Sequence, residues 1–314
     1  QNDFYTFEHH VLTVGLESEE DKVRSRVNAD YFDFFNNTTA NITSSVSASV
    51  RNNAVYLQDQ FSFGDLTGTA GVRIDKHERF RHETTWRLAL SRQFPALAMR
   101  VRGSIATGFK APTANQLFVD SLTSFGPFTG NPNLRPETSR GWELGADRSF
   151  AGDRFSAGLT WYQQRIRDLI TFNSTFTSNE NRDRVRIRGA EGYLHGEFGE
   201  RLSARLGASY TRSEDAATGE NLLRRPLRKA TLSLDYDATA ATRFGLETVY
   251  TGPRYDIDAV NFARIRRGGY TLTSLTASHA PGRNLALHAR VNNLTDKDFE
   301  GLPIPKKAWD DEAA

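Results

Sequence analysis

The feature that most constrains the fold of this chain is an alternation of apolar and polar residues, with a period of two, that recurs along nearly its whole length. One segment shows the pattern clearly, because a single face would carry Gly68, Ala70, Val72 and Ile74. Successive side chains of a β-strand point to opposite faces, so the alternation predicts amphipathic strands, and no segment shows helical periodicity. About thirteen strands are expected, at residues 10–19, 53–63, 66–76, 84–94, 98–107, 139–149, 154–165, 185–198, 201–212, 229–237, 242–251, 270–279 and 284–293.

The connections between these predicted strands alternate between short and long. Short connections are expected at residues 64–65, 95–97, 150–153, 199–200, 238–241 and 281–283. Long connections are expected at residues 20–52, 77–83, 108–138, 166–184, 213–228, 252–269 and after 293. This alternation is typical of an outer-membrane meander, whereas a soluble sandwich has irregular loops and Greek-key crossings. The sequence therefore predicts an all-β fold: a transmembrane, antiparallel up-and-down β-barrel segment of about thirteen strands.

Composition sets limits but does not choose the fold class. No apolar run approaches the roughly 18 residues of a transmembrane helix, which does not exclude a membrane protein, because a barrel strand exposes only every second residue to lipid. The formal net charge is +2, and the 40 basic and 38 acidic residues are spread along the chain, which argues against a nucleic-acid binder. The chain has no cysteine, so disulfides and thiolate metal sites are excluded.

Two motifs flank the connection at residues 108–138. The first, TGFKAPTANQLF, spans residues 107–118, and the second, GNPNLRPETSRGWELG, spans residues 130–145. This pair closely resembles the TonB-dependent outer-membrane receptors, in particular the cobalamin and ferric-siderophore receptor branch. Residues 52–63, NNAVYLQDQFSF, and 289–299, ARVNNLTDKDF, resemble further strands of the same family. The resemblance covers nearly the whole chain.

The resemblance implies a receptor or transporter barrel in the outer membrane of a Gram-negative cell. Such a receptor takes up a scarce ligand, of the siderophore-iron or cobalamin type, with energy from the TonB complex. The expected partners are membrane lipid, lipopolysaccharide and that ligand, with the TonB complex reached only through a plug. A passive porin-like or structural barrel is the first alternative, and a surface adhesin is the second.

The resemblance does not extend to all parts of such receptors. No segment resembles the plug or its energy-coupling box, and the residues after 298 do not resemble a closing strand that ends in an aromatic residue. We therefore expect residues 1–299 to form a C-terminal portion of the β-barrel, about strands nine to twenty-one of twenty-two, and residues 300–314 to form a non-strand tail. A bilayer does not tolerate open sheet edges, so we expect the chain alone neither to import ligand nor to form a sealed pore.

The residues do not indicate an enzyme. The histidines lack metal-ligand spacing, and His9 and His10 are adjacent, so they point to opposite faces of a strand. Serines such as Ser104 lack the context of a nucleophile elbow. We expect no catalytic residue, no metal site and no cofactor.

Acidic residues in two of the long connections allow one further interpretation, a calcium site. Asp256 and Asp258, with Glu214 and Asp215 in another loop, carry the oxygen ligands that calcium prefers. The favoured interpretation is that these loop acids are solvated and bind no ion.

Four carboxylates fall on the polar face of predicted strands: Glu17, Glu143, Glu191 and Glu247. Around Glu143, for example, Trp142 and Leu144 point the other way. In the family that the chain resembles, barrel carboxylates at such positions pair with arginines of the plug, which implies a plug-contact role. The alternative is pairing within the barrel wall, with Arg73, Arg205 or Arg290.

Ligand contacts are expected from aromatic and cationic residues of the long loops, which suit an anionic or aromatic ligand. These residues are Phe109, Phe118, Phe125, Arg224, Arg225, Tyr255, Phe262, Arg264, Arg266 and Arg267. Two alternatives stay open: the arginines bind lipopolysaccharide phosphates or water, and the aromatic residues pack inside their own loops.

Overall fold

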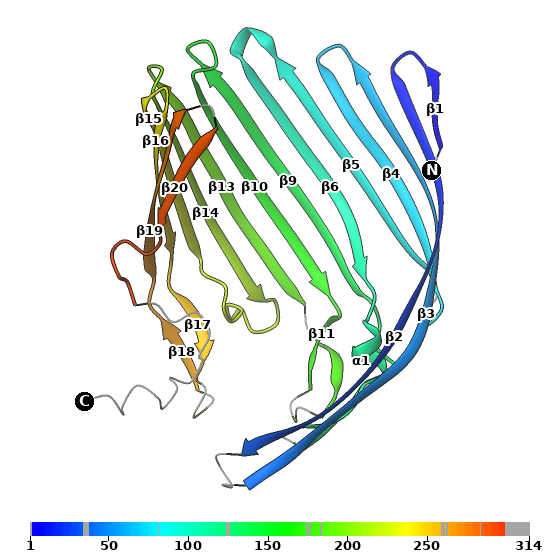
Figure 1. Cartoon of the computed structure of the whole chain (residues 1–314). Helices are drawn as coiled ribbons and strands as arrows, with labels where there is room; N and C mark the ends of the chain where they lie inside the picture. Colours follow the sequence, from blue (N-terminus) through cyan, green and yellow to red (C-terminus); the bar gives the residue numbers. More distant parts are fainter. Residues whose placement is uncertain are drawn as a thin grey trace, which may run out of the picture. The chain divides into compact units, whose positions relative to one another are not determined.

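The computed structural model describes residues 2–33, 38–80, 82–123, 126–173, 175, 177–182, 184–258, 261, 263–282 and 284–298. Its main sheet contains 16 strands, and fourteen of them follow one another as hydrogen-bonded neighbours in the order of the chain (Figure 1). Neighbouring strands pair in antiparallel register along the first six and along the last five strands of this order. The predicted up-and-down meander is therefore confirmed.

The fourteen strands are β1 (Asn2–Phe7), β2 (His10–Asp33), β3 (Thr38–Phe63), β4 (Leu66–His77), β5 (His82–Phe94), β6 (Met99–Lys110), β9 (Glu137–Phe150), β10 (Phe155–Arg167), β13 (Val185–Phe198), β14 (Leu202–Asp215), β15 (Arg228–Thr239), β16 (Thr242–Thr251), β19 (Tyr270–Gly282) and β20 (Leu285–Val291). The short connections lie where the sequence predicts them, and one contains the 3-10 helix η1 (Pro95–Leu97). The expected tail at residues 300–314 lies outside the described residues.

The first strands differ from the prediction. β1 is an additional strand, paired with β2. The expectation of a long connection at residues 20–52 is wrong, because β2 and β3 continue through it and pair from His10 with Phe61 to Asp33 with Thr38. The connection expected at 77–83 is also shorter, since β4 ends at His77 and β5 begins at His82. The ladder pairs β2 and β3 along this whole length, and the buried Val46 and Val50 alternate with polar residues on the face opposite to Val55. The apolar residues of β3 therefore change face along the strand, so no single alternation predicts it in full.

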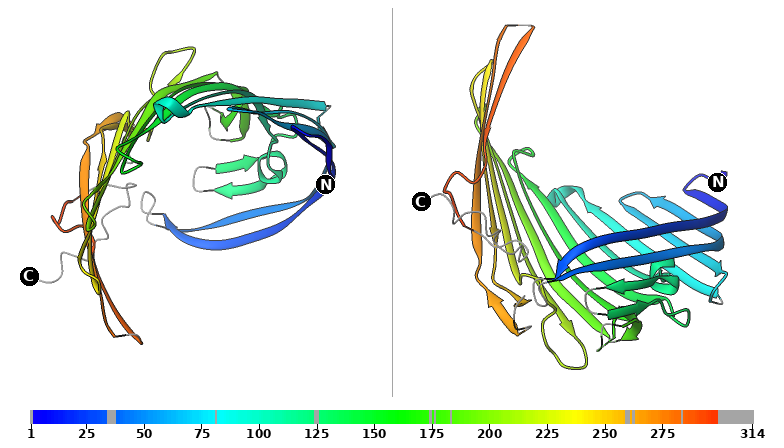
Figure 2. Two further views of the ribbon diagram at one scale, coloured as in Figure 1. Left: turned by 90° about the horizontal axis from the view of Figure 1, so that it is seen from above. Right: turned by 60° about the horizontal axis from the view of Figure 1, so that its bottom comes forward.

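The long connections carry short elements that the alternation did not predict. They are α1 (Ala114–Phe118) and the strands β7 (Asp120–Thr123), β8 (Gly126–Thr129), β11 (Leu169–Phe172), β12 (Asn179–Arg182), β17 (Arg254–Ile257) and β18 (Arg264–Arg267). β7 pairs with the extended part of β3, and Figure 2 shows the β7–β8 hairpin beside it. One isolated parallel bridge joins Thr129 and Ser178. No helix among the described residues has the length and hydropathy needed to span a membrane.

The chain divides into two compact units, and the division passes through β9, β10, β13 and β14. The first unit comprises residues 1–146, 161–188 and 214–220. The second unit comprises residues 147–160, 189–213 and 221–314.

In the first unit, the sheet has an apolar face and a polar face. Residues opposite each other in a ladder share a face, and the register places Leu16 opposite Val55 and Val55 opposite Ile74. These three side chains are exposed, Leu16 by 80%. The cluster of buried apolar residues in this unit lies instead in the loops, at Leu117 and Leu134 with Ile170. An extended apolar face exposed over many strands marks a surface that meets lipid or a partner.

The sheet of the second unit also has an apolar face and a polar face. One row across five strands of its apolar face is Ala204, Leu234, Leu246, Leu275 and Val291. The adjacent row, on the polar face, is Arg205, Ser233, Glu247 and Ser274. The period of two in the sequence therefore corresponds to two chemically distinct faces of a real sheet.

Candidate ligand-binding and plug-contact sites

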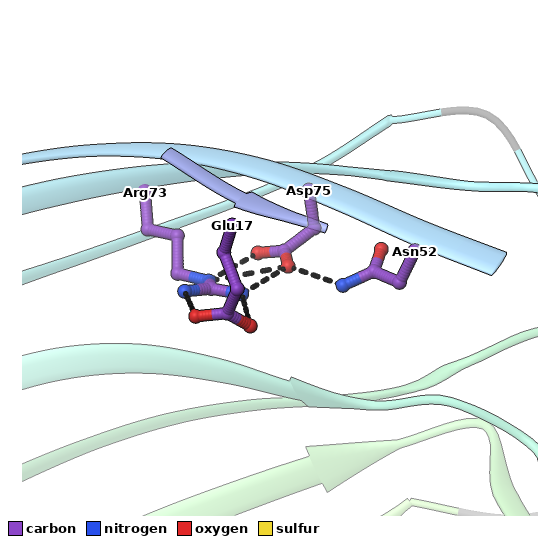
Figure 3. Close-up of polar contacts among 4 residues, drawn as sticks. All are labelled: Glu17, Asn52, Arg73 and Asp75. Carbon is purple, nitrogen blue, oxygen red and sulfur yellow. Dashed lines mark hydrogen bonds and ion pairs between the residues drawn. The ribbon is translucent and has the colours of Figure 1, made fainter. Parts of the chain in front are cut away.

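A network of four polar side chains lies on the polar face of β2, β3 and β4 (Figure 3). The Nη1 and Nη2 atoms of Arg73 donate to the Glu17 carboxylate at 3.1 and 3.0 Å. The Nε and Nη2 atoms of Arg73 donate to the Asp75 carboxylate at 2.9 and 2.8 Å. Asn52 Nδ2 donates to Asp75 Oδ1 at 2.9 Å. Alternation along β4 brings Arg73 and Asp75 to one face, and strand pairing brings Glu17 and Asn52 beside them.

The two carboxylates of this network differ in their exposure. The Asp75 side chain is 2% exposed, whereas the Glu17 side chain is 45% exposed. Arg73 therefore compensates a buried negative charge and also holds a carboxylate that remains open to solvent. Pairing within the wall, which the sequence left as the alternative for Glu17, is present. An additional contact between Glu17 and a plug cation stays a prediction.

The other three carboxylates make weaker contacts. Glu143 accepts a hydrogen bond from Ser104 Oγ at 3.2 Å. Glu247 lies 3.9 Å from a guanidinium nitrogen of Arg290, at the limit of an ion pair. Glu191 is exposed on β13. Their plug-contact role also stays a prediction.

Several of the predicted ligand residues meet at the β17–β18 hairpin. The ladder places Tyr255 opposite Arg266, and Arg264 lies two positions along β18, so all three share one face of the hairpin. The Arg264 guanidinium lies 4.6 Å from the centre of the Tyr255 ring. It also donates to the backbone carbonyl of Asn221. The arrangement presents fixed positive charge beside an aromatic ring, which suits an anionic ligand with planar groups.

An ion pair between the half-exposed Arg224 and the buried Asp256 anchors this hairpin to the preceding loop. Arg224 Nε donates to Asp256 Oδ1 at 2.8 Å, and the backbone N–H of Arg224 donates to the carbonyl of Tyr255 at 2.7 Å. Asp256 is 1% exposed. Burial alone would raise the pKa of the Asp256 carboxyl, but hydrogen bonds from Arg224 and the Ile257 N–H, with the charges of Arg224 and Arg267, lower it overall.

This pairing corrects the interpretation of the loop acids. Asp256 is not a solvated acid, because it is buried against Arg224. Glu214 pairs with Arg186 and Arg188, at 3.5 and 3.7 Å. Asp215 accepts the backbone N–H groups of the turn that follows it. No group of three or more histidine or acidic residues able to hold a metal ion occurs in the described part of the chain.

The other residues that the sequence predicts to contact ligand lie apart from the shared face of Tyr255, Arg264 and Arg266, or outside the described residues. Phe118 packs against the loop cluster of Leu117, and the Arg79 guanidinium lies 4.7 Å from the centre of its ring. Phe109 packs edge-on against Phe80. Arg225 is exposed, and Arg267 lies opposite Arg254 in the β17–β18 ladder. Phe125 and Phe262 lie outside the described residues. The ligand role of all of them stays a prediction.

The second motif has a structural role that sequence analysis missed. Leu134 is 5% exposed and belongs to the buried loop cluster. Asn181 Nδ2 donates to the backbone carbonyl of Arg135 at 2.8 Å, and the Arg135 N–H donates back to Asn181 Oδ1 at 2.7 Å. Glu137 accepts the backbone N–H of Ile170 at 3.1 Å. The motif therefore ties the connection before β9 to the connection after β10.

The first motif also contains a local signal that sequence analysis missed. Thr113 caps α1 by accepting from the Gln116 N–H, while the Gln116 side chain accepts from the Thr113 N–H. A threonine followed three residues later by glutamine is the capping-box signature. This signature would have predicted α1.

Comparisons with known proteins agree with this architecture. A family profile described as "TonB dependent receptor-like, beta-barrel" matches residues 1–294. A mutant of the ferric enterobactin receptor PfeA from Pseudomonas aeruginosa is similar with a TM-score of 0.70 and 20% identity, over 92% of this chain and 49% of that chain. The siderophore receptor PirA from Acinetobacter baumannii is similar with a TM-score of 0.68 and 17% identity, over 92% of this chain and 51% of that chain.

The FrpB iron transporter from Neisseria meningitidis is similar with a TM-score of 0.68 and 16% identity, over 94% of this chain and 49% of that chain. The chain spans about half the length of these solved structures. These neighbours are receptors and a transporter rather than enzymes. With the family match over residues 1–294, the chain belongs to the TonB-dependent receptor β-barrel family.

Proposed function

We propose that this chain forms barrel strands and ligand-binding loops of an outer-membrane receptor that imports a ferric siderophore in an energy-coupled manner. The family match over residues 1–294 carries this proposal. The exposed apolar faces of both units suit contact with lipid, and the polar faces suit a lumen. Residues 1–299 are the barrel part under this proposal, and the long connections face the cell exterior.

The β17–β18 hairpin supports an anionic, aromatic iron chelate over cobalamin. Its exposed face combines Tyr255, Arg264 and Arg266, and a ferric catecholate offers both negative charge and planar rings to such a face. The names of the solved neighbours refer to siderophores and iron. Glu17, Glu143, Glu191 and Glu247 are proposed to contact the plug of the working receptor.

An uptake assay tests this function. The receptor that contains this chain is expressed in a Gram-negative strain that lacks its own siderophore receptors, with and without a functional TonB protein. Uptake of radioactive iron is measured with a catecholate, a hydroxamate and no siderophore, and uptake of labelled cobalamin is measured in parallel. We expect saturable, TonB-dependent uptake of the ferric catecholate.

The other outcomes separate the alternatives. Uptake that persists without TonB, for solutes unrelated in chemistry, would indicate a passive porin-like barrel. Cobalamin uptake without iron uptake would show that the ligand is cobalamin and not a ferric siderophore. Cell adhesion without any uptake would indicate an adhesin and overturn the proposal.

A further inference from the structure

We propose that His77 is a pH-sensitive latch, which holds the β4–β5 connection against α1 while its ring is neutral and releases α1 when the ring takes up a proton. The inference goes beyond the proposed function and is the same for any ligand. His77 is the last residue of β4, is 8% exposed and lies two residues after Asp75, on the polar face. Histidine gains its charge between pH 5 and 8, so a buried imidazole responds to pH in this range.

His77 lies outside the apolar band of the sheet. One apolar row across β2, β3 and β4 is Leu16, Val55 and Ile74. The next row on the same face is polar and consists of Ser18, Asn53 and Lys76. His77 follows Lys76 at the end of the strand, so water and protons reach its surroundings.

Two contacts of the His77 ring fix the β4–β5 connection. Its Nδ1 atom accepts the backbone N–H of Arg79 at 3.2 Å. The ring stacks on Phe80, with ring centres 4.0 Å apart and an angle of 5° between the ring planes. A neutral imidazole with its proton on Nε2 makes both contacts. The positions of Arg79 and Phe80 therefore depend on the protonation state of His77.

Arg79 and Phe80 carry the contact to the connection at residues 108–138. The Arg79 guanidinium lies 4.7 Å from the centre of the Phe118 ring, in α1. Phe80 packs edge-on against Phe109 at the end of β6, with ring centres 6.3 Å apart. Phe118 in turn packs against the buried loop cluster. His77 therefore positions the two side chains that hold α1 and the beginning of this connection.

Protonation changes this arrangement at one atom. A protonated imidazole donates from both nitrogens, so Nδ1 of His77 can no longer accept the Arg79 N–H. The new positive charge is also buried and lies close to the charge of Arg79. Stacking on Phe80 tolerates either state, because a cation is attracted to the face of an aromatic ring. The lost acceptor and the buried charge therefore decide the direction of the response.

The charged groups around His77 act in both directions. Burial lowers the pKa of His77 and is the largest effect, Glu78, Asp21 and Asp75 raise this pKa, and Arg79 lowers it. The resulting pKa lies below the ordinary value of 6.5, so the closed connection favours the neutral ring. This preference stabilises the closed connection above pH 6.5 and is lost as the pH falls through the lowered pKa. Further ionisable residues at this end of the neighbouring strands are Glu19, Arg51, Lys76, His82, Glu83 and Lys110.

Hydrogen–deuterium exchange tests the latch in the receptor that contains this chain, purified in detergent. Labelling at pH 7.5 and at pH 5.0 uses exposure times adjusted for the chemical exchange rate at each pH. The reporting amides are those of Arg79, Gln116 and Leu117, each of which donates a hydrogen bond. In the wild type we expect them to exchange severalfold faster at pH 5.0. The upper limit is about thirtyfold, the factor by which a group with a pKa of 6.5 favours an open connection at that pH.

The variants separate His77 from other titrating groups. His77→Asn keeps an acceptor for the Arg79 N–H but does not titrate. It should exchange like the wild type at pH 7.5 and lose the increase at pH 5.0. His77→Gln carries the same amide on a longer side chain and repeats the test if His77→Asn does not fold. His82→Asn is the matched control, because His82 is exposed on β5, and this variant should keep the wild-type response.

Equal exchange of the wild type at the two pH values would overturn the latch. A response that persists in His77→Asn and His77→Gln, or one that disappears in His82→Asn, would do the same, because another group would then titrate. The measurement involves neither ligand nor uptake. A negative result would therefore leave the proposed function unaffected, and failure of the uptake assay would leave the exchange result unaffected.

Discussion

At the scale of single residues, the stability of the sheet depends on how its charged side chains are paired and how far each pair is removed from water. The guanidinium of Arg73 shows the principle, because it contacts a buried and an exposed carboxylate at once. The energy of each contact depends on how far its carboxylate is removed from water. The two ends of the network should therefore respond differently to mutation.

Arg73→Gln should lower the free energy of unfolding by about 3–5 kcal/mol, because it leaves the buried Asp75 carboxylate without its cation. Glu17→Gln is the matched change at the exposed end, and it should cost less than about 1 kcal/mol. Urea titrations of protein refolded into bilayers measure both values. Similar costs for the two variants would contradict the network as described.

The two faces of β10 offer a second contrast. Leu159 is 61% exposed on the apolar face, and Thr160 follows it on the polar face. Leu159→Arg should cost about 2–4 kcal/mol if position 159 lies near the bilayer midplane, whereas Thr160→Arg should cost much less. The same bilayer titration compares them. An equal loss of unfolding free energy in the two variants would contradict the assignment of the faces.

At the scale of elements, the long connections are built structures rather than open chain. α1 and the connection before β9 approach so closely that Gly130 has no space for a side chain. A Cβ at Gly130 would lie 2.5 Å from the backbone of Leu117 and Phe118. Such a contact with backbone atoms forces the loop to shift.

Gly130→Ala should therefore destabilise the connection by about 1–3 kcal/mol, with faster proteolysis of residues 108–138. Gly268→Ala is the control, because no atom lies within 4 Å of its Cβ position. Limited proteolysis followed by mass spectrometry locates the cleavage sites. A variant at Gly130 that resists protease as well as the control does would show that the packing of α1 is misplaced.

The β17–β18 hairpin should respond to pH through Asp256. Its folded pKa lies below the unshifted value of 3.8, so the ionised carboxylate stabilises the hairpin at pH values above 3.8. This stabilisation is lost as the pH falls below 3.8 through the lowered pKa. Amide exchange protection of residues 254–257 and 264–267 should fall in that range, and Asp256→Asn should remove the change. Protection that stays constant in the wild type below pH 3.8 would refute the role of the ion pair.

Sequence alone predicted the elements whose pattern records their environment. Leu159 and Leu246 alternate with polar residues because one side of each strand is apolar, and this predicted the strands and their antiparallel order. The outer part of β3 was missed although Val46 and Val50 alternate with polar residues there, because these two lie on the face opposite to Val55, so no single alternation runs through the whole strand. The partner of Arg224 was missed because Asp256 lies 32 residues away and is brought close only by the fold.

At the scale of the whole molecule, the proposed membrane location requires the apolar face of the sheet to meet lipid and the polar face to meet water. This division of faces applies to every strand of the main sheet, whatever ligand the receptor binds. Because this sequence contains no cysteine, a cysteine introduced at any one position is its single labelling site. The surroundings of each face can therefore be measured position by position.

The most direct measurement is a nitroxide scan of β16 in liposomes, with one cysteine introduced at each position from 244 to 249. Collision with oxygen reports lipid exposure, and collision with a water-soluble nickel chelate reports water exposure. We predict that labels at 244, 246 and 248 collide mainly with oxygen and labels at 245, 247 and 249 mainly with the nickel chelate, because β16 places the two sets on opposite faces. Uniform access of the nickel chelate to all six positions would contradict the membrane barrel.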